Sequence, residues 1–381
     1  MTKKLALTIG VLLTVSVAVL LWFKLTGKAG EVRIGVALPL TGNMAEYGTN
    51  GKEGLTLALE ELSRQPEMPK FTLLYQDTKE TPQETVNAVR RLIDYEGVQY
   101  IIGGLTSSGV LAAAPYAQKQ GVIFFSPAAS APGIPEIGNM IFRNWPGDDT
   151  ISRQFGEAIY QSGVREIAIL HVANDYGKTN ADGFTAGFQA AGGKVILSRA
   201  FAQGSTDFKS LTVQLAGLPR KTKTFVIGYP DEYRSFFQEL TNTTLSPDDI
   251  LTSDTFYSPN LLAELGQLVN GVKCAVASKP GDDYQPRQAF ISAYSARFQT
   301  PKGQPKQPGL VSDTAYDALK LLALAISQTG GEPAEVSDFL LAKIINYPGA
   351  IGPTSFTKEG DIQGEMSLYQ VENGHFLPWT P

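Results

Sequence analysis

The chain has 381 residues, which is too long for one small core and fits two lobes of ordinary domain size. Hydrophobic residues make up 43% of it and the formal net charge is −5, so we expect a folded, mildly acidic protein. An acidic body repels phosphate groups and no lysine- and arginine-rich stripe is present, which excludes nucleic acid as a partner. The single cysteine, Cys274, excludes an intramolecular disulfide and a cysteine-based zinc site, and we expect it to be buried.

The first residues, 1–30, predict export. Two lysines precede an uncharged apolar run over residues 5–23. This run is long enough to span a bilayer as a retained anchor, yet it also fits a signal peptide cleaved near the small residues Gly27 and Ala29. Both interpretations stay open. Under either one, the lysines predict a cytoplasmic N-terminus, so the rest of the chain is expected outside the cytoplasm, in a periplasm or at the cell surface.

From residue 31 onward, short apolar runs typical of buried strands alternate with segments of helical periodicity. In the first half, the strands are expected within 31–42, 71–78, 98–105 and 122–130, and the helices within 50–65, 82–97 and 107–121. The same alternation resumes with helices in 150–163, 177–193, 206–219 and 232–240, and with strands in 165–174, 194–203, 223–230, 249–258 and 269–280. Long helices follow in 288–299 and 311–331, and residues 351–376 resemble two antiparallel strands. This order predicts an α/β fold with mostly parallel sheets flanked by helices.

Two clusters of small residues follow neighbouring strands of the expected first sheet. They are "GGLTSSG" at 103–109 and "FFSPAAS" at 124–130. Ser107 or Ser108 is expected to cap the next helix, but capping alone does not explain the second cluster. Ligands of open α/β sheets bind outside the carboxyl ends of the strands, so both clusters point to one crevice. Small residues there expose backbone N–H and C=O groups, which suits a ligand with both an anionic and a cationic end.

The usual catalytic and cofactor motifs are absent from the sequence. No glycine cluster has the dinucleotide fingerprint or the ending of a phosphate-binding loop, and "GGLTSSG" is not a nucleophile elbow. The chain has two histidines: His171 at the end of an apolar run, expected to be a strand-end residue near the crevice, and His375 near the C-terminus. Neither has a carboxylate at ligand spacing, so we predict no metal site and no cofactor.

The chain from about Val32 resembles the branched-chain amino-acid-binding proteins, the Leu/Ile/Val-type substrate-binding proteins of ABC transporters, which have the type I periplasmic-binding fold. The resemblance rests on several motifs in the right order: "VALPLTGNMAEYG", "YIIGGLTSSG", "FFSPAASAP", "FRNWPGDD", "HVANDYG", "TDF", "IGYPDEY" and "IGPTSFTKEGD". It implies two lobes joined by a three-strand hinge. The lobes would comprise residues 31–148 with 279–352, and residues 149–278 with 353–381.

The resemblance also implies which residues bind the ligand. Ser107 would donate its hydroxyl to a ligand carboxylate, helped by the backbone N–H of Ser130. Ala128 would offer its carbonyl to the ammonium group, and Ser130 would add a hydroxyl where well-known members have threonine. Asp254, in "LTSDTF", stands where those members have glutamate paired with the ammonium.

Aromatic residues are expected to complete this site. Tyr176 in "NDYG" and Tyr229 in "GYPDEY" match family positions that close over the ligand from the second lobe. Tyr47 in "AEYG" matches a position near the ligand side chain. Trp145, beside a hinge, is expected to pack the hinge or to border the pocket.

The expected function is therefore that of an extracytoplasmic receptor, not an enzyme, that captures an amino acid or a close analogue and delivers it to ABC permease subunits. Two alternatives remain. A retained N-terminal anchor would allow a ligand-sensing ectodomain of the same fold. An amide or ester hydrolase would use Ser107 as its nucleophile.

Overall fold

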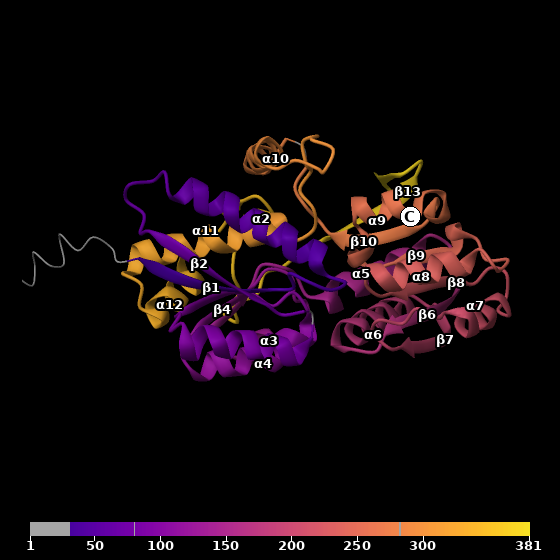
Figure 1. The fold of residues 1–381 in the computed structure, drawn as a ribbon. Coiled ribbons are helices and arrows are strands. Elements are labelled where there is room, and N and C mark those ends of the chain that lie inside the picture. Colours follow the sequence, from indigo (N-terminus) through magenta and orange to yellow (C-terminus); the bar gives the residue numbers. More distant parts are fainter. Residues whose placement is uncertain (1–30, 80, 282) are drawn as a thin grey trace, which may run out of the picture.

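The computed structural model describes residues 31–79, 81–281 and 283–381, and the N-terminal export segment predicted above lies outside these residues. Two large, separate sheets organise the described chain (Figure 1). No helix within the described ranges is long and apolar enough to cross a membrane.

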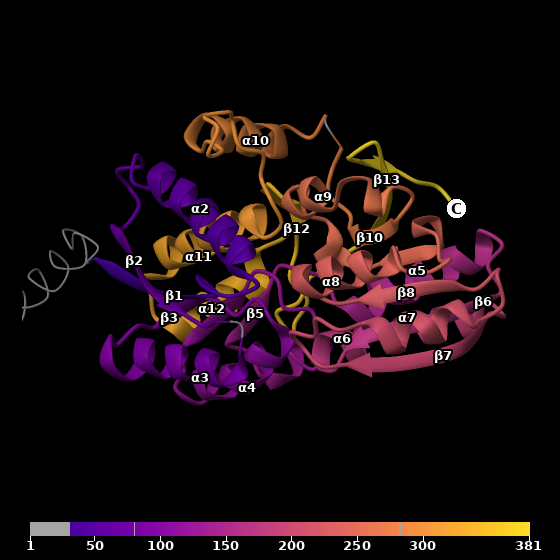
Figure 2. The ribbon, with the colours of Figure 1, turned by 45° about the vertical axis from the view of Figure 1, so that its right-hand side comes forward.

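The first sheet has five strands, all parallel. Their spatial order is β2 (Phe71–Asp77), β1 (Val32–Leu38), β3 (Tyr100–Gly103), β4 (Ile123–Ser126) and β5 (Ile141–Arg143). Helices cover both of its faces (Figure 2): α2 (Ala45–Leu62), α3 (Pro82–Arg90), α4 (Ser107–Lys119), α11 (Ser312–Thr329) and α12 (Pro333–Lys343). We call this sheet and these helices the first lobe; α10 (Gln285–Arg297) contacts it through α2.

The second sheet has seven strands. Their spatial order is β14 (His375–Pro378), β13 (Met366–Glu372), β10 (Lys273–Ala277), β9 (Ile250–Thr252), β8 (Lys223–Ile227), β6 (Glu166–Val172) and β7 (Lys194–Phe201). It is parallel except for the antiparallel strands β13 and β14. Together with its helices it forms the second lobe: α5 (Asp148–Gln161), α6 (Asp175–Ala190), α7 (Lys209–Ala216), α8 (Pro230–Leu240) and α9 (Pro259–Leu265).

The chain passes between the two sheets three times. The passages run from β5 to α5, from β10 to α10, and from the short hairpin β11 (Tyr347–Gly349) and β12 (Gly352–Thr354) to β13. We call these segments the three crossings. The exact residues at which the lobes divide stay a prediction.

Parallel pairing places the two small-residue clusters together. β3 and β4 are hydrogen-bonded neighbours, so their carboxyl ends reach the same edge of the first sheet. Gly103 and Gly104 both have positive φ angles, and a Cβ on Gly103 would lie 2.1 Å from the carbonyl oxygen of Ala37. Only glycine fits there, and the chain can therefore turn sharply from β3 into the loop before α4.

Candidate functional site

One cavity between the lobes collects all seven residues that the resemblance implied. Its empty space is about 420 Å³, which includes solvent at its open mouth. The seven are Tyr47, Ser107, Ala128, Ser130, Tyr176, Tyr229 and Asp254. The first four come from the first lobe and the last three from the second, so the cavity is complete only when the lobes face each other. Their contact with a ligand stays a prediction.

The Ser107 hydroxyl is placed as a hydrogen-bond donor. We expected Ser107 or Ser108 to cap α4, and this is wrong: Thr106 has the extended backbone of a cap, and its hydroxyl oxygen accepts from the N–H of Gly109 at 3.3 Å. Ser107 Oγ instead accepts from the N–H groups of Ser130 (3.3 Å) and Ala131 (3.1 Å). With two N–H donors on its oxygen, its own proton remains to be donated.

Asp254 forms the acidic end of the cavity. It opens a short 3-10 turn, Asp254–Phe256, one residue after the end of strand β9, and it is 9% exposed. The Tyr176 hydroxyl donates to Asp254 Oδ1 at 2.6 Å, and the N–H of Thr255 donates to the same oxygen at 2.9 Å. No lysine or arginine of the described chain pairs with it. Burial raises the pKa of this carboxyl.

A second buried carboxylate, Asp148, stands behind Ser130. Its Oδ2 accepts hydrogen bonds from the Ser130 hydroxyl and from Nδ2 of Asn180, the latter at 2.7 Å. Because the Ser130 proton is used for Asp148, the Ser130 oxygen faces the cavity as an acceptor. Burial, and after it repulsion from Asp254, raises the pKa of Asp148 to about 8. Both carboxylates line a smaller cavity behind the first one.

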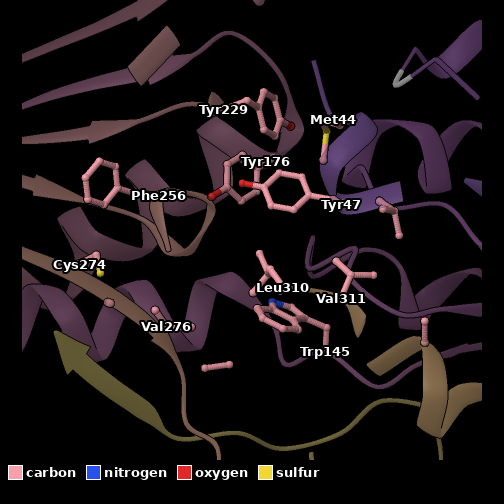
Figure 3. Close-up of a cluster of buried hydrophobic side chains, with 14 of the residues drawn as sticks. Met44, Tyr47, Trp145, Tyr176, Tyr229, Phe256, Cys274, Val276, Leu310 and Val311 are labelled. Atoms are coloured by element: carbon pink, nitrogen blue, oxygen red, sulfur yellow. The ribbon is translucent and has the colours of Figure 1, made fainter. Parts of the chain in front are cut away.

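Four aromatic residues and several aliphatic side chains form the remaining walls (Figure 3). Tyr176 and Tyr229 stack with their ring centres 5.4 Å apart, at 22°. Tyr47 points toward them from α2, and its hydroxyl donates across the cleft to the carbonyl oxygen of Thr255 at 2.6 Å. The other apolar lining residues are Met44, Leu105, Trp145, Leu310 and Val311.

A second contact joins the lobes at the rim of the cleft. The Glu46 carboxylate at the start of α2 accepts from Ser258 Oγ and from Asn260 Nδ2, both at 3.0 Å. Since Glu46 belongs to the first lobe and its two donors to the second, the structure has its lobes in contact over the cavity.

The sequence model of one protein family, described as "Periplasmic binding protein", matches residues 31–375. This chain belongs to the periplasmic binding protein family. Among curated relatives, a Leu/Ile/Val-binding protein of Rhizobium johnstonii, BraC3, is 26% identical over 91% of this chain and 93% of its own. A leucine-, isoleucine-, valine-, threonine- and alanine-binding protein of Pseudomonas aeruginosa is 25% identical, with 90% of each chain covered.

Two solved structures have a similar fold. A leucine-binding protein from Thermotoga maritima superposes with a TM-score of 0.83 at 25% identity, covering 92% of this chain and 98% of that one. A solute-binding protein of an R. palustris ABC transporter, in complex with benzoate, gives a TM-score of 0.82 at 19% identity over 92% of this chain and 96% of its own. The fold is therefore the type I periplasmic-binding fold, as the sequence predicted.

Several residues in and behind this cavity escaped the sequence analysis. Asp148 follows "FRNWPG", and nothing local shows that its carboxylate reaches Ser130 and Asn180. Leu310 and Val311 arrive from a distant segment before α11. Trp145, expected either to pack the hinge or to border the pocket, does both: it is 4% exposed and lines the cavity. His171 lies on β6 away from the cavity lining, with Nδ1 3.1 Å from the carbonyl oxygen of Val172.

Proposed function

We propose that this protein is an extracytoplasmic receptor that captures an amino acid between its lobes and delivers it to the permease of an ABC transporter. One observation carries the proposal: a single cavity between the lobes has a donor hydroxyl, Ser107, on the first lobe and, on the second, a buried carboxylate, Asp254, with which no cation of the described chain pairs. A buried, unpaired carboxylate is costly unless a cation meets it. Two relatives named as binding proteins for leucine, isoleucine and valine support the same ligand class.

The anionic end of the ligand is assigned to the carboxyl ends of β3 and β4. Ser107 donates its hydroxyl to the ligand carboxylate. The N–H groups of Ser130 and Ala131 donate to Ser107 Oγ, so they lie near the same place and can also donate to the ligand carboxylate. Ser107 is the first residue of α4, so the positive end of that helix lies at the same place.

The cationic end is assigned to Asp254, with the Ala128 carbonyl and the Ser130 oxygen as further acceptors. Ser130 gives its proton to Asp148, so its oxygen suits an ammonium group rather than a carboxylate. The resemblance implied that the Ser130 N–H helps to bind the ligand carboxylate. This role is compatible with an oxygen that accepts from the ammonium group, because the two roles use different atoms of Ser130. Aliphatic side chains such as Leu105, Leu310 and Val311 line the cavity, which favours an apolar ligand side chain.

Capture is proposed to occur by lobe closure. The hydroxyl and the carboxylate lie on different lobes, so both ends of a ligand are held only while the lobes face each other. A ligand therefore shifts the population toward the closed form, which a permease can recognise.

Removing the Tyr47 hydroxyl is expected to weaken amino-acid binding about threefold to tenfold, because Tyr47→Phe deletes the hydrogen bond to the Thr255 carbonyl that exists only in the closed form. Calorimetric titration measures the affinity, and small-angle scattering should show less compaction at the same ligand concentration. Tyr95→Phe is the matched control, since Tyr95 is 86% exposed. Equal affinities for the Tyr47 variant and the wild type would contradict this role.

The receptor hypothesis and the hydrolase hypothesis predict different results: reversible binding of an amino acid in the first case, and turnover of its amide or ester in the second. The ligand released by denaturing freshly purified protein is identified by mass spectrometry, and the refolded protein is then titrated with the common amino acids. The receptor predicts stoichiometric, reversible binding. With the corresponding amino-acid amides and esters, we expect no turnover by wild type or by Ser107→Ala; turnover that the Ser107 variant loses would establish the hydrolase instead.

A further inference from the structure

A buried arginine, Arg143, connects two of the crossings with one loop of the amino-acid site. It is the last residue of β5, where the first crossing begins, and it is 2% exposed. Its Nε and Nη2 donate to the two carboxylate oxygens of Asp361, at 2.6 Å and 2.7 Å. Asp361 belongs to the third crossing, between β12 and β13. Because two parallel hydrogen bonds join the guanidinium to the carboxylate, the orientation of the guanidinium is fixed.

The remaining nitrogen of the guanidinium, Nη1, contacts the loop of residues 126–131. It donates to the carbonyl oxygen of Ala131 at 2.9 Å. The N–H groups of Ser130 and Ala131 donate to Ser107 Oγ, and the proposed function places both of them at the ligand carboxylate. Arg143 is not among the described residues that line the amino-acid cavity. Any effect of its hydrogen bonds on a ligand therefore passes through this loop.

The two ends of the loop are anchored by different side chains. At its start, Ser126 Oγ accepts from the N–H of Ala129 at 3.0 Å. At its end, the carbonyl oxygen of Ala131 accepts from the N–H of Ile134 at 3.2 Å and from Arg143. The bond from Arg143 is the shorter of these two and has a charged donor, and such bonds are roughly twice as strong as neutral ones. Arg143 therefore restrains the end of the loop that carries the two N–H groups.

The third crossing brings Asp361 to the guanidinium through a tight turn against β5. The carbonyl oxygen of Gly360 accepts from the Arg143 N–H at 3.0 Å, and Asp361 Oδ1 accepts from the N–H of Ile362 at 2.8 Å. Gly360 has a φ of +76°, and a Cβ there would lie 2.5 Å from the carbonyl oxygen of Ile141, so glycine is required. These contacts fix Asp361 beside Arg143, and the hinge and the loop therefore share one ion pair.

We propose that Arg143 is a positioning residue of the amino-acid site: through the Ala131 carbonyl it aims the N–H groups of Ser130 and Ala131 at the ligand carboxylate. Asp361 holds the guanidinium in the required orientation. This inference rests on the proposed function, and it predicts that the carboxylate end of the ligand is affected selectively, because Asp254 holds the ammonium from the second lobe. The restraint on the loop does not depend on a ligand, so it can be measured whether or not the protein is a receptor.

Arg143→Lys tests this role, because lysine keeps the positive charge beside Asp361 but its single ammonium group cannot reproduce the fork and also reach Ala131. Amide hydrogen exchange of peptides that cover residues 126–131 is measured by mass spectrometry on the ligand-free protein. Displacement calorimetry then gives the affinities for leucine, or the amino acid that the protein prefers, and for its amide, which lacks the carboxylate charge. Lys279→Met is the matched control, because it breaks a charge pair at the second crossing that does not involve the loop.

In Arg143→Lys we expect exchange in the loop to be at least about fivefold faster, the amino acid to bind about tenfold more weakly, and the amide to bind within about twofold of wild type. The ratio of the two affinities therefore falls about fivefold or more. In Lys279→Met the loop should exchange at the wild-type rate, and the amino acid and its amide should change in affinity by the same factor.

Unchanged loop exchange in Arg143→Lys would overturn the positioning role. Faster exchange with equal losses of affinity for the amino acid and its amide would overturn the selective effect on the carboxylate end. If Arg143→Lys does not fold, Asp361→Asn is expected to show the same changes, since that side chain is 21% exposed and keeps one acceptor oxygen. A wild type that binds no amino acid, with a loop that the substitution still loosens, would refute the receptor and leave the restraint on the loop standing.

Discussion

Replacing Asp254 by asparagine is expected to weaken amino-acid binding by about 100-fold or more. The substitution keeps the size of the side chain and its acceptor oxygen but removes the charge that meets the ammonium group. Truncating one partner of a buried, hydrogen-bonded charge pair costs about 2–5 kcal/mol, which corresponds to roughly 30-fold to several-thousand-fold in the dissociation constant. Calorimetric titration with the preferred amino acid measures the loss.

The same substitution is expected to stabilise the ligand-free protein. Asp254 is buried and no cation of the described chain pairs with it, so removing its charge relieves desolvation. Above about pH 8, where Asp148 is ionised too, it also relieves repulsion between the two carboxylates. A gain of about 1 kcal/mol would raise Tm by roughly 2–4 °C. Asp175→Asn is the matched control, because Asp175 is exposed on the same lobe. Unchanged binding in the Asp254 variant would show that this carboxylate does not meet the ammonium.

Asp148 is expected to make both stability and amino-acid binding depend on pH. Its pKa is raised to about 8 in the folded protein, against about 3.9 for a free aspartate. Between pH 4 and pH 8 the folded state therefore binds more protons than the unfolded state. The free energy of unfolding falls as the pH rises through this window, and the loss is complete above the folded pKa.

Ligand binding should have the opposite pH dependence. An ammonium group near the two carboxylates favours their ionised forms, so its arrival lowers their pKa values and releases a proton. We therefore expect the amino-acid affinity to increase between about pH 5 and pH 8, with proton release visible as a calorimetric heat that depends on the buffer.

The test of this pH dependence is Asp148→Asn. The amide keeps an oxygen that can accept from Ser130 and Asn180 but cannot ionise. We expect the variant to show a flatter Tm profile between pH 5 and pH 8 and to release less proton on binding. Asp149→Asn changes the exposed neighbour and should behave as wild type. A full wild-type slope in the Asp148 variant would assign the pH dependence to other groups.

The fold could be predicted because its signals are local. Apolar strands alternating with amphipathic helices leave few alternatives to a parallel sheet. The small-residue clusters marked the edge of the sheet at which the cavity lies for a related reason, since β3 and β4 are neighbours and each cluster lies at the carboxyl end of its strand. Cys274 is buried, as its apolar surroundings predicted.

The remaining parts of the site depend on contacts between distant segments. Asp148 lies 32 residues from Asn180 and 18 from Ser130, and no periodicity in the sequence indicates that their side chains meet. Trp145 had two expected environments because a residue at a crossing can pack the hinge or border the pocket. The helix cap was missed by one residue, since Thr106, Ser107 and Ser108 are all suitable cap residues and only the backbone conformation distinguishes them.

The central claim is that one cavity holds both charged ends of an amino acid. Calorimetry with the preferred amino acid and with two blocked derivatives, its N-acetyl form and its amide, tests it most directly. Each derivative keeps the side chain and removes one charge. We predict that the free amino acid binds and that each derivative loses at least about 100-fold in affinity. An N-acetyl or amide form that binds as tightly as the free amino acid would contradict the account.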